Sequence, residues 1–456
     1  MKRKLIKALR FDYETLITLG YVSKNPQRQL LLGYFAYIVI GTLLLCLPFM
    51  TTNHIANWVD HLFSATSAVS TTGLATVDVA TTYSFWGQLT ILALVQIGGL
   101  GYMTLSSFVM YSLTKHFTMI KKGILEAEFA LPGNININHL VKSIVIFTFS
   151  IEIIGAAFLY LFFVQAGAAS PVWSAIFHSV SAFCTAGFSI YSDNLMQFDS
   201  NIGVNIVIIL LCYLGAMGFI FIIDIWRKLT IKDYKVTFTT KIIIVMTLIL
   251  STWGTAQMYF LESHLQSYPP FERFIVSLFQ TMSALSTAGY NTINIGNMLP
   301  ITIITLTSIM YFGASPSGTG GGLKSTTSSA VFAFVKCKLS MKRDTYLFGN
   351  RLPSFRVDTA ITTFALYTTI LFFGAYFLTA TEKGVLYIQL LFEAASALGT
   401  VGLTTGITTS LTIAGKFIII VLMYIGRVGV LTIGTAMLLR MEDRTSKFKR
   451  SEDLAV

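Results

Sequence analysis

Ser67-Ala68-Val69-Ser70-Thr71-Thr72-Gly73-Leu74 is the first of four copies of one pattern: Ser-Ala, an apolar residue, any residue, Thr, any residue, Gly, and a second apolar residue. The later copies are Ser181-Ala182-Phe183-Cys184-Thr185-Ala186-Gly187-Phe188, Ser283-Ala284-Leu285-Ser286-Thr287-Ala288-Gly289-Tyr290 and Ser396-Ala397-Leu398-Gly399-Thr400-Val401-Gly402-Leu403. A phenylalanine stands ten residues before each glycine: Phe63, Phe177, Phe279 and Phe392. The glycines are 114, 102 and 113 residues apart, so one internal repeat organises most of the 456 residues.

Each copy is read as a turn at the end of an apolar helix, where glycine permits a positive φ. Four such loops around an axis form rings of carbonyl oxygens that replace the hydration shell of a cation, as in potassium channels. The predicted filter residues are Ser70, Thr71, Thr72, Gly73, Cys184, Thr185, Ala186, Gly187, Ser286, Thr287, Ala288, Gly289, Gly399, Thr400, Val401 and Gly402. The alternative, four simple turns between helices, does not require a fixed register of Ser-Ala, Thr and Gly.

The composition indicates a polytopic membrane protein, because 54% of the residues are hydrophobic and only 12% are charged. The net charge of +11 could point to nucleic acid, but the basic residues lie in short segments between apolar runs. The four cysteines have neither disulfide nor zinc spacing. We therefore expect an all-α membrane protein that binds no nucleic acid and is not an enzyme.

Around each filter turn the apolar pattern predicts a module of one span, a half-length pore helix, the turn and a second span. A re-entrant loop of this kind is tolerated in a membrane only where protein or water surrounds it. The predicted spans are 30–50, 84–113, 140–165, 201–229, 236–261, 300–339, 357–379 and 411–439, and the pore helices are 58–69, 172–183, 271–285 and 386–398. The modules cover 30–114, 140–229, 236–340 and 357–440, between an N-terminal tail 1–29 and a C-terminal tail 441–456. We expect eight spans and four pore helices around one central pore.

The distribution of Lys and Arg predicts the orientation. Segments 1–29, 114–143, 226–241, 335–357 and 440–450 hold 27 of the 32 basic residues. These segments are both termini and every connection between modules, so we place them in the cytoplasm. The filter loops then face outward, flanked by Asp60, Asp78, Asp193, Asp199, Glu262, Glu272 and Glu382. That acidic excess either concentrates cations at the mouth or is ordinary loop polarity.

Two features inside the predicted membrane region indicate a gate. The second span of the third module is interrupted over 313–327, where five glycines and one proline oppose a regular helix. Arg427 lies near the middle of the last span, where a charge faces a cavity or a partner; the candidate carboxylate partners are Glu152, Asp224 and Glu393. His178 and Glu393 share one position of two pore helices and are interpreted as asymmetry of the ion vestibule. The predicted gate residues are Gly313, Ser315, Pro316, Gly318, Gly320, Gly321, Gly322, Lys324 and Arg427.

The four T-x-G loops, the glycine-rich break and the Arg in the last span resemble the Trk/Ktr/HKT superfamily of potassium transporters. Stretches such as Gln96-Ile97-Gly98-Gly99-Leu100-Gly101 are most similar to the membrane, ion-translocating subunits of bacterial Ktr systems. The resemblance covers roughly residues 30–440. It implies filter glycines at Gly73, Gly187, Gly289 and Gly402, a gate at 313–327 and an electrostatic barrier at Arg427.

The resemblance also implies a homodimer in the bacterial plasma membrane, docked on a cytoplasmic ring of nucleotide-binding (RCK/KTN type) subunits. ATP or ADP would bind to that partner, since this chain has no nucleotide-binding motif of its own. Gly73 favours potassium over sodium, because some relatives that prefer sodium have serine there; sodium dependence of uptake stays open. The expected function is potassium uptake. The alternative is a proton- or sodium-coupled carrier of another small solute, a class that also uses internal repeats and broken helices.

Overall fold

The computed structural model describes residues 26–52, 56–101, 137–313 and 315–438, and these residues are mostly helical. Residues 1–25 of the predicted N-terminal tail, the C-terminal tail 441–456 and most of the connection between the first two modules lie outside the described residues, whereas 26–29 belong to the first helix. The α-helices are α2 (Pro26–Leu45), α3 (Trp58–Val69), α4 (Val79–Thr82), α5 (Phe85–Leu100), α8 (Ile137–Gln165), α9 (Pro171–Phe183), α10 (Ile202–Met217), α11 (Phe219–Thr230), α12 (Phe238–Leu261), α13 (Pro270–Leu285), α14 (Pro300–Phe312), α15 (Ser325–Leu339), α16 (Ser354–Thr381), α17 (Tyr387–Leu398), α18 (Ile413–Val428) and α19 (Val430–Leu438). Two short strands, β1 (Tyr346–Leu347) and β2 (Asn350–Arg351), form a hairpin between α15 and α16.

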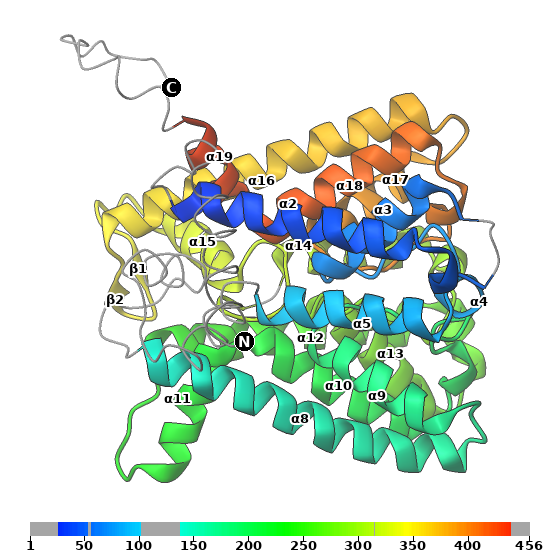
Figure 1. Cartoon of the computed structure of the whole chain (residues 1–456). Coiled ribbons are helices and arrows are strands. Elements are labelled where there is room, and N and C mark those ends of the chain that lie inside the picture. Colours follow the sequence, from blue (N-terminus) through cyan, green and yellow to red (C-terminus); the bar gives the residue numbers. More distant parts are fainter. Residues whose placement is uncertain (1–25, 53–55, 102–136, 314, 439–456) are drawn as a thin grey trace, which may run out of the picture.

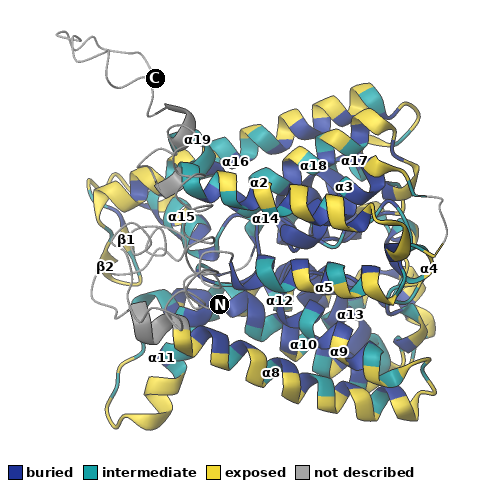
Figure 2. Cartoon of the chain, in the orientation of Figure 1, coloured by how far each residue is buried: buried dark blue, intermediate teal, exposed yellow. Residues whose placement is uncertain are grey.

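Four of the described helices, α2, α8, α12 and α16, are long and apolar enough to cross a membrane, and α10 and α11 pass the same test only when taken together, although a bend separates them. Their outer faces carry exposed large apolar side chains, for example Phe149 and Ile153 on α8 and Phe373 and Tyr376 on α16 (Figure 2). Apolar surface on this scale requires an apolar solvent, and the chain is therefore a membrane protein with several apolar spans.

The four shorter helices α3, α9, α13 and α17 end at the repeated motif, and each packs against the long helix that precedes it. Each also contacts a helix from a neighbouring module: α3 packs on α18, α9 on α5, α13 on α10 and α17 on α14. These contacts lead from module to module and return from the fourth to the first. The repeats are thus arranged in a closed ring (Figure 1).

The second helix of every repeat stops at a glycine with positive φ. These glycines are Gly101 (φ 78°), Gly218 (φ 83°), Gly313 (φ 46°) and Gly429 (φ 93°). The break at Gly313 was expected, but the continuous spans predicted over 201–229 and 411–439 were wrong. Gly218 separates α10 from α11 with a bend of 99°, and Gly429 separates α18 from α19. The predicted span 84–113 is helical to Leu100, and its remainder beyond Gly101 lies outside the described residues.

Candidate functional site

All four repeated motifs end their helices in the same way. In the first, the N–H of Thr72 donates to the Ser67 carbonyl over 2.8 Å and the N–H of Thr71 donates to the Ala68 carbonyl over 3.1 Å. This is a Schellman motif, which places its C′ residue in the left-handed region where glycine is usual. Here that residue is the motif threonine, with φ of 53° at Thr71, 52° at Thr185, 58° at Thr287 and 49° at Thr400. A β-branched residue with positive φ is a genuine outlier, and its fourfold recurrence indicates a functional requirement.

The motif serine braces the loop that follows its helix. The N–H groups of Gly73 and Gly402 each donate to the serine hydroxyl of their own motif, Ser67 and Ser396, over 3.0 Å. In the other two copies the hydroxyls of Ser181 and Ser283 donate to the carbonyls one residue beyond the glycine, over 2.9 and 2.6 Å. The motif alanine and the phenylalanine ten residues before the glycine are buried in every copy. Each loop is therefore fixed by its own helix.

The four loops meet one another in a cycle. A methyl group added to any of the four glycines would overlap the carbonyl oxygen of the residue that precedes the glycine of the next loop. The pairs are Gly73 with Ala186, Gly187 with Ala288, Gly289 with Val401, and Gly402 with Thr72. The structure thus brings the four predicted filter glycines and the residues that precede them into one ring. Glycine is required because only a residue without Cβ fits against the neighbouring carbonyl.

The glycine-rich segment 313–327 lies directly against the motif threonines of this ring. The Thr185 hydroxyl donates to the Thr319 hydroxyl over 3.1 Å, and the Gly321 N–H donates to the Thr287 hydroxyl over 3.1 Å. A methyl group on Gly321 would overlap the Thr400 hydroxyl oxygen. The intramembrane loop is therefore packed on the side of the ring that carries the motif threonines. This side is called below the ring from here on. Ala314 lies outside the described residues.

Arg427 connects this loop to the first motif. Its guanidinium donates to the Thr71 hydroxyl over 3.0 Å, to the Thr319 carbonyl over 2.6 Å and to the Gly98 carbonyl. The alternative pairing with Glu152, Asp224 or Glu393 is wrong for the described structure, since each of these carboxylates accepts hydrogen bonds from other groups. Lys324 has only carbonyl partners in its own loop, Gly320 at 2.6 Å and Gly321 at 3.5 Å.

Two basic side chains without described carboxylate partners, Arg427 and Lys324, therefore lie below the ring. The guanidinium charge of Arg427 would oppose the passage of a cation through a low-dielectric path.

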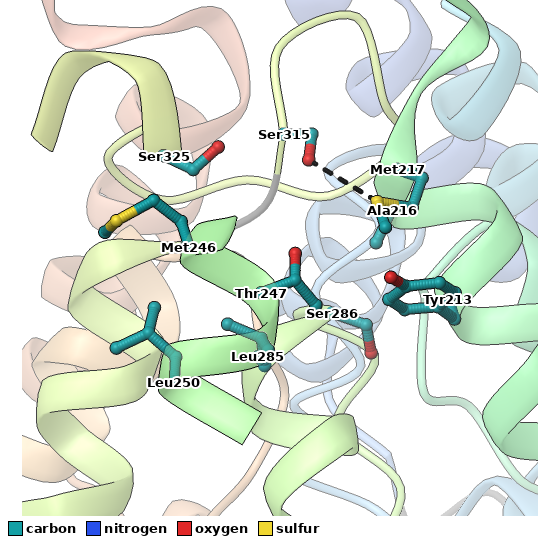
Figure 3. Close-up of a pocket in the computed structure, with 11 residues that line it drawn as sticks. Tyr213, Ala216, Met217, Met246, Thr247, Leu250, Leu285, Ser286, Ser315 and Ser325 are labelled. Atoms are coloured by element: carbon teal, nitrogen blue, oxygen red, sulfur yellow. Dashed lines mark hydrogen bonds between the residues drawn. The ribbon is translucent and has the colours of Figure 1, made fainter. Parts of the chain in front are cut away.

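A small cavity of about 20 Å³, enough for about one water molecule, adjoins the loop. It lies between α10, α12 and the third filter loop, and Figure 3 shows Ser286 on one side and Ser315 and Ser325 on another. The remaining walls are mainly apolar, with Met217, Met246 and Leu250 among them. A space of this size does not accommodate the loop, so displacement of the loop requires the neighbouring side chains to move.

His178 and Glu393 do not line a vestibule, so that interpretation was wrong. Both side chains are fully buried behind their filter loops. The Glu393 carboxylate accepts hydrogen bonds from the Thr405 N–H at 3.1 Å, the Thr408 hydroxyl at 3.0 Å and the Thr404 hydroxyl. An imidazole nitrogen of His178 is 2.9 Å from the Ser189 hydroxyl. Both residues hold the segment that follows the filter glycine.

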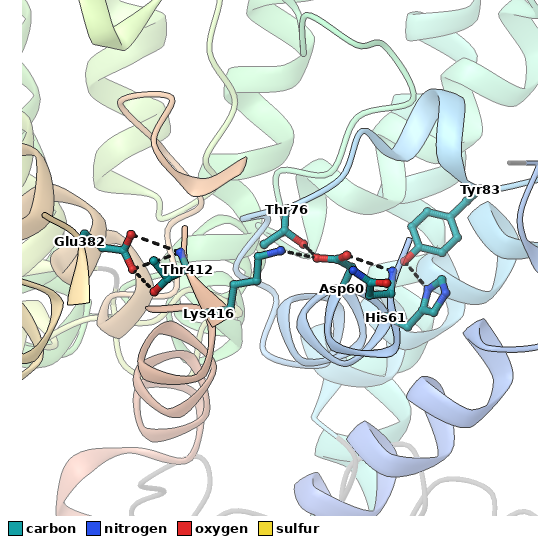
Figure 4. A network of polar contacts seen from close by, with 8 residues as sticks. Asp60, His61, Thr76, Tyr83, Glu382, Thr412 and Lys416 are labelled. Carbon is teal, nitrogen blue, oxygen red and sulfur yellow. Dashed lines mark hydrogen bonds and ion pairs between the residues drawn. The ribbon is translucent and has the colours of Figure 1, made fainter. Parts of the chain in front are cut away.

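Three of the acidic residues assigned to the outer mouth are buried instead. Asp60 forms an ion pair of 2.7 Å with Lys416 and accepts from the Thr76 hydroxyl over 2.8 Å (Figure 4). Glu262 and Glu382 each accept hydrogen bonds from the first residues of the following second helix, at Leu299 and Thr412. They cap helices and do not face the solvent. For these residues ordinary loop polarity is therefore favoured over a role in concentrating cations at the mouth.

Some residues of the site were not singled out from the sequence. Thr319 belongs to the predicted gate segment but was not named, although it contacts both Thr185 and Arg427. Gly98, Gly215 and Gly426 allow the second helix to touch the carbonyl at the end of the pore helix. The sequence pattern that could have identified these glycines is the repeated Gly-x-x-Gly at 98–101, 215–218 and 426–429. Buried Glu152 accepts from the Gln96 amide over 3.2 Å and lies 3.8 Å from the Cys184 sulfur, behind the second filter loop.

No group of His, Cys, Asp and Glu side chains that could hold a metal ion occurs among the described residues. The ring offers carbonyl and hydroxyl oxygens instead, which are ligands for weakly bound monovalent cations. The chemistry that this arrangement offers is therefore dehydration and binding of a cation, with the glycine-rich segment packed against the ring.

Comparison with known proteins supports this interpretation. Residues 29–447 match the model of the TrkH family, described as cation transport proteins. The chain is 35% identical over 439 residues to Ktr system potassium uptake protein B of Bacillus subtilis (strain 168), covering 94% of both chains. It is 32% identical over 426 residues to the protein of the same name from Vibrio alginolyticus, covering 92% of this chain and 93% of the relative.

A relative with a different name is the potassium/sodium uptake protein NtpJ of Enterococcus hirae, 32% identical over 439 residues, with 94% of this chain and 96% of the relative covered. The crystal structure of the potassium transporter TrkH from Vibrio parahaemolyticus has a similar fold. Its TM-score is 0.74 at 20% sequence identity, covering 94% of this chain and 87% of that one. These relatives are named as uptake proteins and transporters, not as enzymes.

Proposed function

The chain belongs to the TrkH family of cation transport proteins, and on this premise we propose that it takes up potassium through a pore formed by its four filter loops. The observation that carries the proposal is the closed cycle of glycines and carbonyls, in which each loop supports the next. Such a ring supplies the oxygens that a potassium ion loses with its hydration shell. The names of the relatives from Bacillus and Vibrio support potassium as the cation.

In this proposal each repeat is one span, one pore helix, one filter loop and one broken second span, giving eight spans around one pore. The basic segments between the modules place both termini in the cytoplasm of a bacterial cell. The pore helices point their C-terminal ends at the ring, and the negative end of a helix dipole favours a cation there.

The gate is the intramembrane loop 313–327 together with Arg427. The loop's contacts with the motif threonines at Thr185 and Thr287 support a closed position directly below the ring. Arg427 adds a hydrogen-bonded tie and a positive charge. Opening would break these hydrogen bonds and shift the side chains packed around the loop.

A separate regulatory subunit would control this gate. The names of the relatives make them parts of a Ktr system, and the exposed basic segment 335–357, with the β1–β2 hairpin, offers a cytoplasmic docking region close to the end of α15. The partner would be a ring of nucleotide-binding subunits that binds ATP or ADP, and two copies of this chain would sit on it. A partner can open the gate only if it binds the open state more tightly.

Uptake would be driven by the membrane potential, since each 100 mV supplies about 2.3 kcal/mol per elementary charge, equivalent to roughly fifty-fold accumulation. Sodium would modulate or accompany the flux, as the name of the relative from Enterococcus allows. The second candidate, a coupled carrier of another small solute, is favoured by the broken second helices, which occur in such carriers.

Purified protein in proteoliposomes separates the two candidates. We expect ⁸⁶Rb⁺ or potassium to accumulate when valinomycin-free vesicles carry an inside-negative potential and to stop accumulating when the potential is collapsed. A parallel test is growth at low potassium of a strain without its own uptake systems, with and without the regulatory subunit. Absence of ⁸⁶Rb⁺ or potassium accumulation at any potential would favour the carrier of another solute instead. Accumulation that persists at zero potential and without a sodium gradient would contradict uptake driven by the membrane potential.

A further inference from the structure

Helix α11 leaves the transmembrane body at a right angle. It follows α10 with a bend of 99° at Gly218, while α10 runs inward from the filter side. A helix perpendicular to a span lies along the plane of the bilayer, and Figure 1 shows the far end of α11 projecting beyond the other helices. After Thr230 the chain returns to the membrane at Phe238, the start of α12. The segment between two spans is therefore held at the bilayer surface.

The projecting end carries both apolar and basic side chains. Trp226, Leu229 and Ile231 are 67%, 78% and 52% exposed, and they are the residue types that insert at the headgroup level of a bilayer. The exposed basic residues of the same end are Arg227, Lys228, Lys232 and Lys235, and Asp233 is the exposed acid among them. Exposed aromatic and basic side chains at one end of a helix parallel to the membrane fit an anionic lipid surface.

The segment is rigid enough to present these side chains together. Buried Asp224 on α11 accepts hydrogen bonds from the Tyr234 hydroxyl at 2.6 Å and from the Thr237 N–H at 2.8 Å. The return segment 231–237 is thereby fixed against α11. The basic residues on the two parts form one continuous group.

We propose that α11 and residues 231–235 form a docking surface for anionic phospholipids of the inner leaflet. Arg227, Lys228, Lys232 and Lys235 bind the headgroup phosphates, and Trp226, Leu229 and Ile231 enter the boundary between headgroups and acyl chains. Each basic side chain near the surface favours anionic lipid by roughly fivefold.

The docking surface is connected to the intramembrane loop through Gly218. The Phe219 N–H donates to the Ser317 carbonyl over 3.2 Å, directly after the hinge. Before the hinge, the carbonyls of Ala216 and Gly215 accept from the N–H groups of Ser315 and Thr319 over 3.3 and 3.1 Å. A lipid that immobilises α11 therefore also immobilises the backbone to which the intramembrane loop is hydrogen-bonded. Lipid composition should for this reason alter cation flux. This coupling rests on the proposed function; the docking surface does not.

Quenching of tryptophan fluorescence by brominated lipids tests the docking surface in the full chain. The protein is placed in phosphatidylcholine nanodiscs with a small fraction of either brominated phosphatidylglycerol or brominated phosphatidylcholine. The signal of Trp226 is the difference between the wild type and Trp226→Phe. We expect Trp226 to be quenched at least about fivefold more efficiently by the brominated phosphatidylglycerol.

The variant with Arg227→Gln, Lys228→Gln, Lys232→Gln and Lys235→Gln should lose this preference. The matched control removes four other exposed basic residues, by Lys336→Gln, Lys338→Gln, Lys342→Gln and Arg343→Gln, and should keep it. Equal quenching by both lipids in the wild type would overturn the proposal, because α11 would then rest on the bilayer without selecting a headgroup. No quenching of Trp226 by either lipid would also overturn it and would point to a protein partner on this face.

Flux in proteoliposomes with and without phosphatidylglycerol tests the coupling separately. We expect the wild type to respond to the anionic lipid and the four-Gln variant not to respond. A lipid response that is equal in both would remove the coupling and leave the quenching result standing. Absence of cation flux in every vesicle would count against the proposed function, not against the docking surface.

Discussion

At the scale of single residues, the four filter glycines and the four motif threonines act together. Threonine takes the left-handed position of the helix cap, and its hydroxyl faces the intramembrane loop in three motifs and Arg427 in the first. Glycine two residues later leaves space for a carbonyl of the next loop. Neither role can be exchanged between the two positions. Glycine at the cap would lose the hydroxyl, and threonine at the contact would collide with the next loop.

Serine at a filter glycine should therefore weaken selectivity. Gly73→Ser, Gly187→Ser, Gly289→Ser and Gly402→Ser each place a side chain against a carbonyl of the next loop, and we expect the potassium-over-sodium preference to fall about tenfold, an effect of roughly 1.4 kcal/mol. Competitive uptake of ⁸⁶Rb⁺ and ²²Na⁺ measures this. Gly406→Ser is the control, since Gly406 also has a positive φ but no atom near its missing side chain. Unchanged preference in all four variants would remove the filter assignment.

Variants of Arg427 and Lys324 distinguish two explanations of closure: repulsion of the cation by a charge, and hydrogen bonds that hold the loop in place. Both residues are basic and lie below the ring, but only Arg427 joins the loop to the first motif. Hydrogen bonds of a charged donor contribute about 1.5–3 kcal/mol, so Arg427→Gln should raise partner-free potassium flux several-fold more than Lys324→Gln does. Flux in proteoliposomes without the regulatory subunit gives the comparison. Equal increases would mean that the charge alone matters.

At the scale of elements, the broken second helix is the repeated device. Its break at Gly313 was predictable because several glycines and a proline occur together there. The breaks at Gly218 and Gly429 were not predicted, because single glycines are common in transmembrane helices and the apolar run continues through both positions. Alignment of the second helices on the filter glycines would have exposed the Gly-x-x-Gly that precedes each of these two breaks.

The filter loops were predictable for the opposite reason. Their serine and threonine cap the helix and brace the loop of their own motif, and the same eight-residue pattern occurs four times. The repetition made the loops recognisable even though each glycine contacts the next loop. The partners of Arg427 are different, since Gly98 and Thr71 are more than three hundred residues away in the chain. No spacing rule in the sequence identifies such a contact, and three carboxylates were therefore considered as partners in place of carbonyl groups.

The intramembrane loop gives the element-scale prediction. Removal of residues 316–320 deletes Thr319 and with it the contacts to Thr185 and Arg427. We expect high potassium flux without partner or nucleotide, and a larger increase than Arg427→Gln gives, because that variant keeps the loop in the path. Thr319→Ala serves as the point variant and should give an intermediate increase. A deleted loop that reaches the membrane and still needs the partner for full flux would show that the loop is not the gate.

At the scale of the whole molecule, a ring of four tandem modules has one seam that the chain itself does not connect. The polypeptide chain joins the first module to the second, the second to the third and the third to the fourth. The fourth module meets the first only through non-covalent contacts. The polar contacts at this seam in the described structure include Lys416 with Asp60, the Tyr424 hydroxyl donating to the Leu31 carbonyl over 2.7 Å, and Arg427 with Thr71 and Gly98. The ring is therefore closed by polar contacts at both the outer mouth and the level of the gate.

The Asp60–Lys416 pair should make the stability of this closure depend on pH. Burial alone would raise the pKa of Asp60, but hydrogen bonds from Lys416, Thr76 and the Asn57 N–H outweigh it, so the pKa lies below its ordinary value. A carboxyl group whose pKa is lowered by folding stabilises the native state above its unfolded pKa of about 3.9. That contribution is lost as the pH falls through the lowered folded pKa.

We therefore expect Asp60→Asn and Lys416→Met each to lower the thermal unfolding temperature at pH 7, with the double variant little worse than either single one. The difference between wild type and Asp60→Asn should shrink as the pH falls below about 4. The control is Asp344→Asn, which breaks an ion pair with Arg351 whose side chains are 39% and 67% exposed, and exposed pairs contribute little. If Asp60→Asn were as harmless as the control at pH 7, the seam would be held by the apolar contacts of α3 with α18 and not by its ion pair.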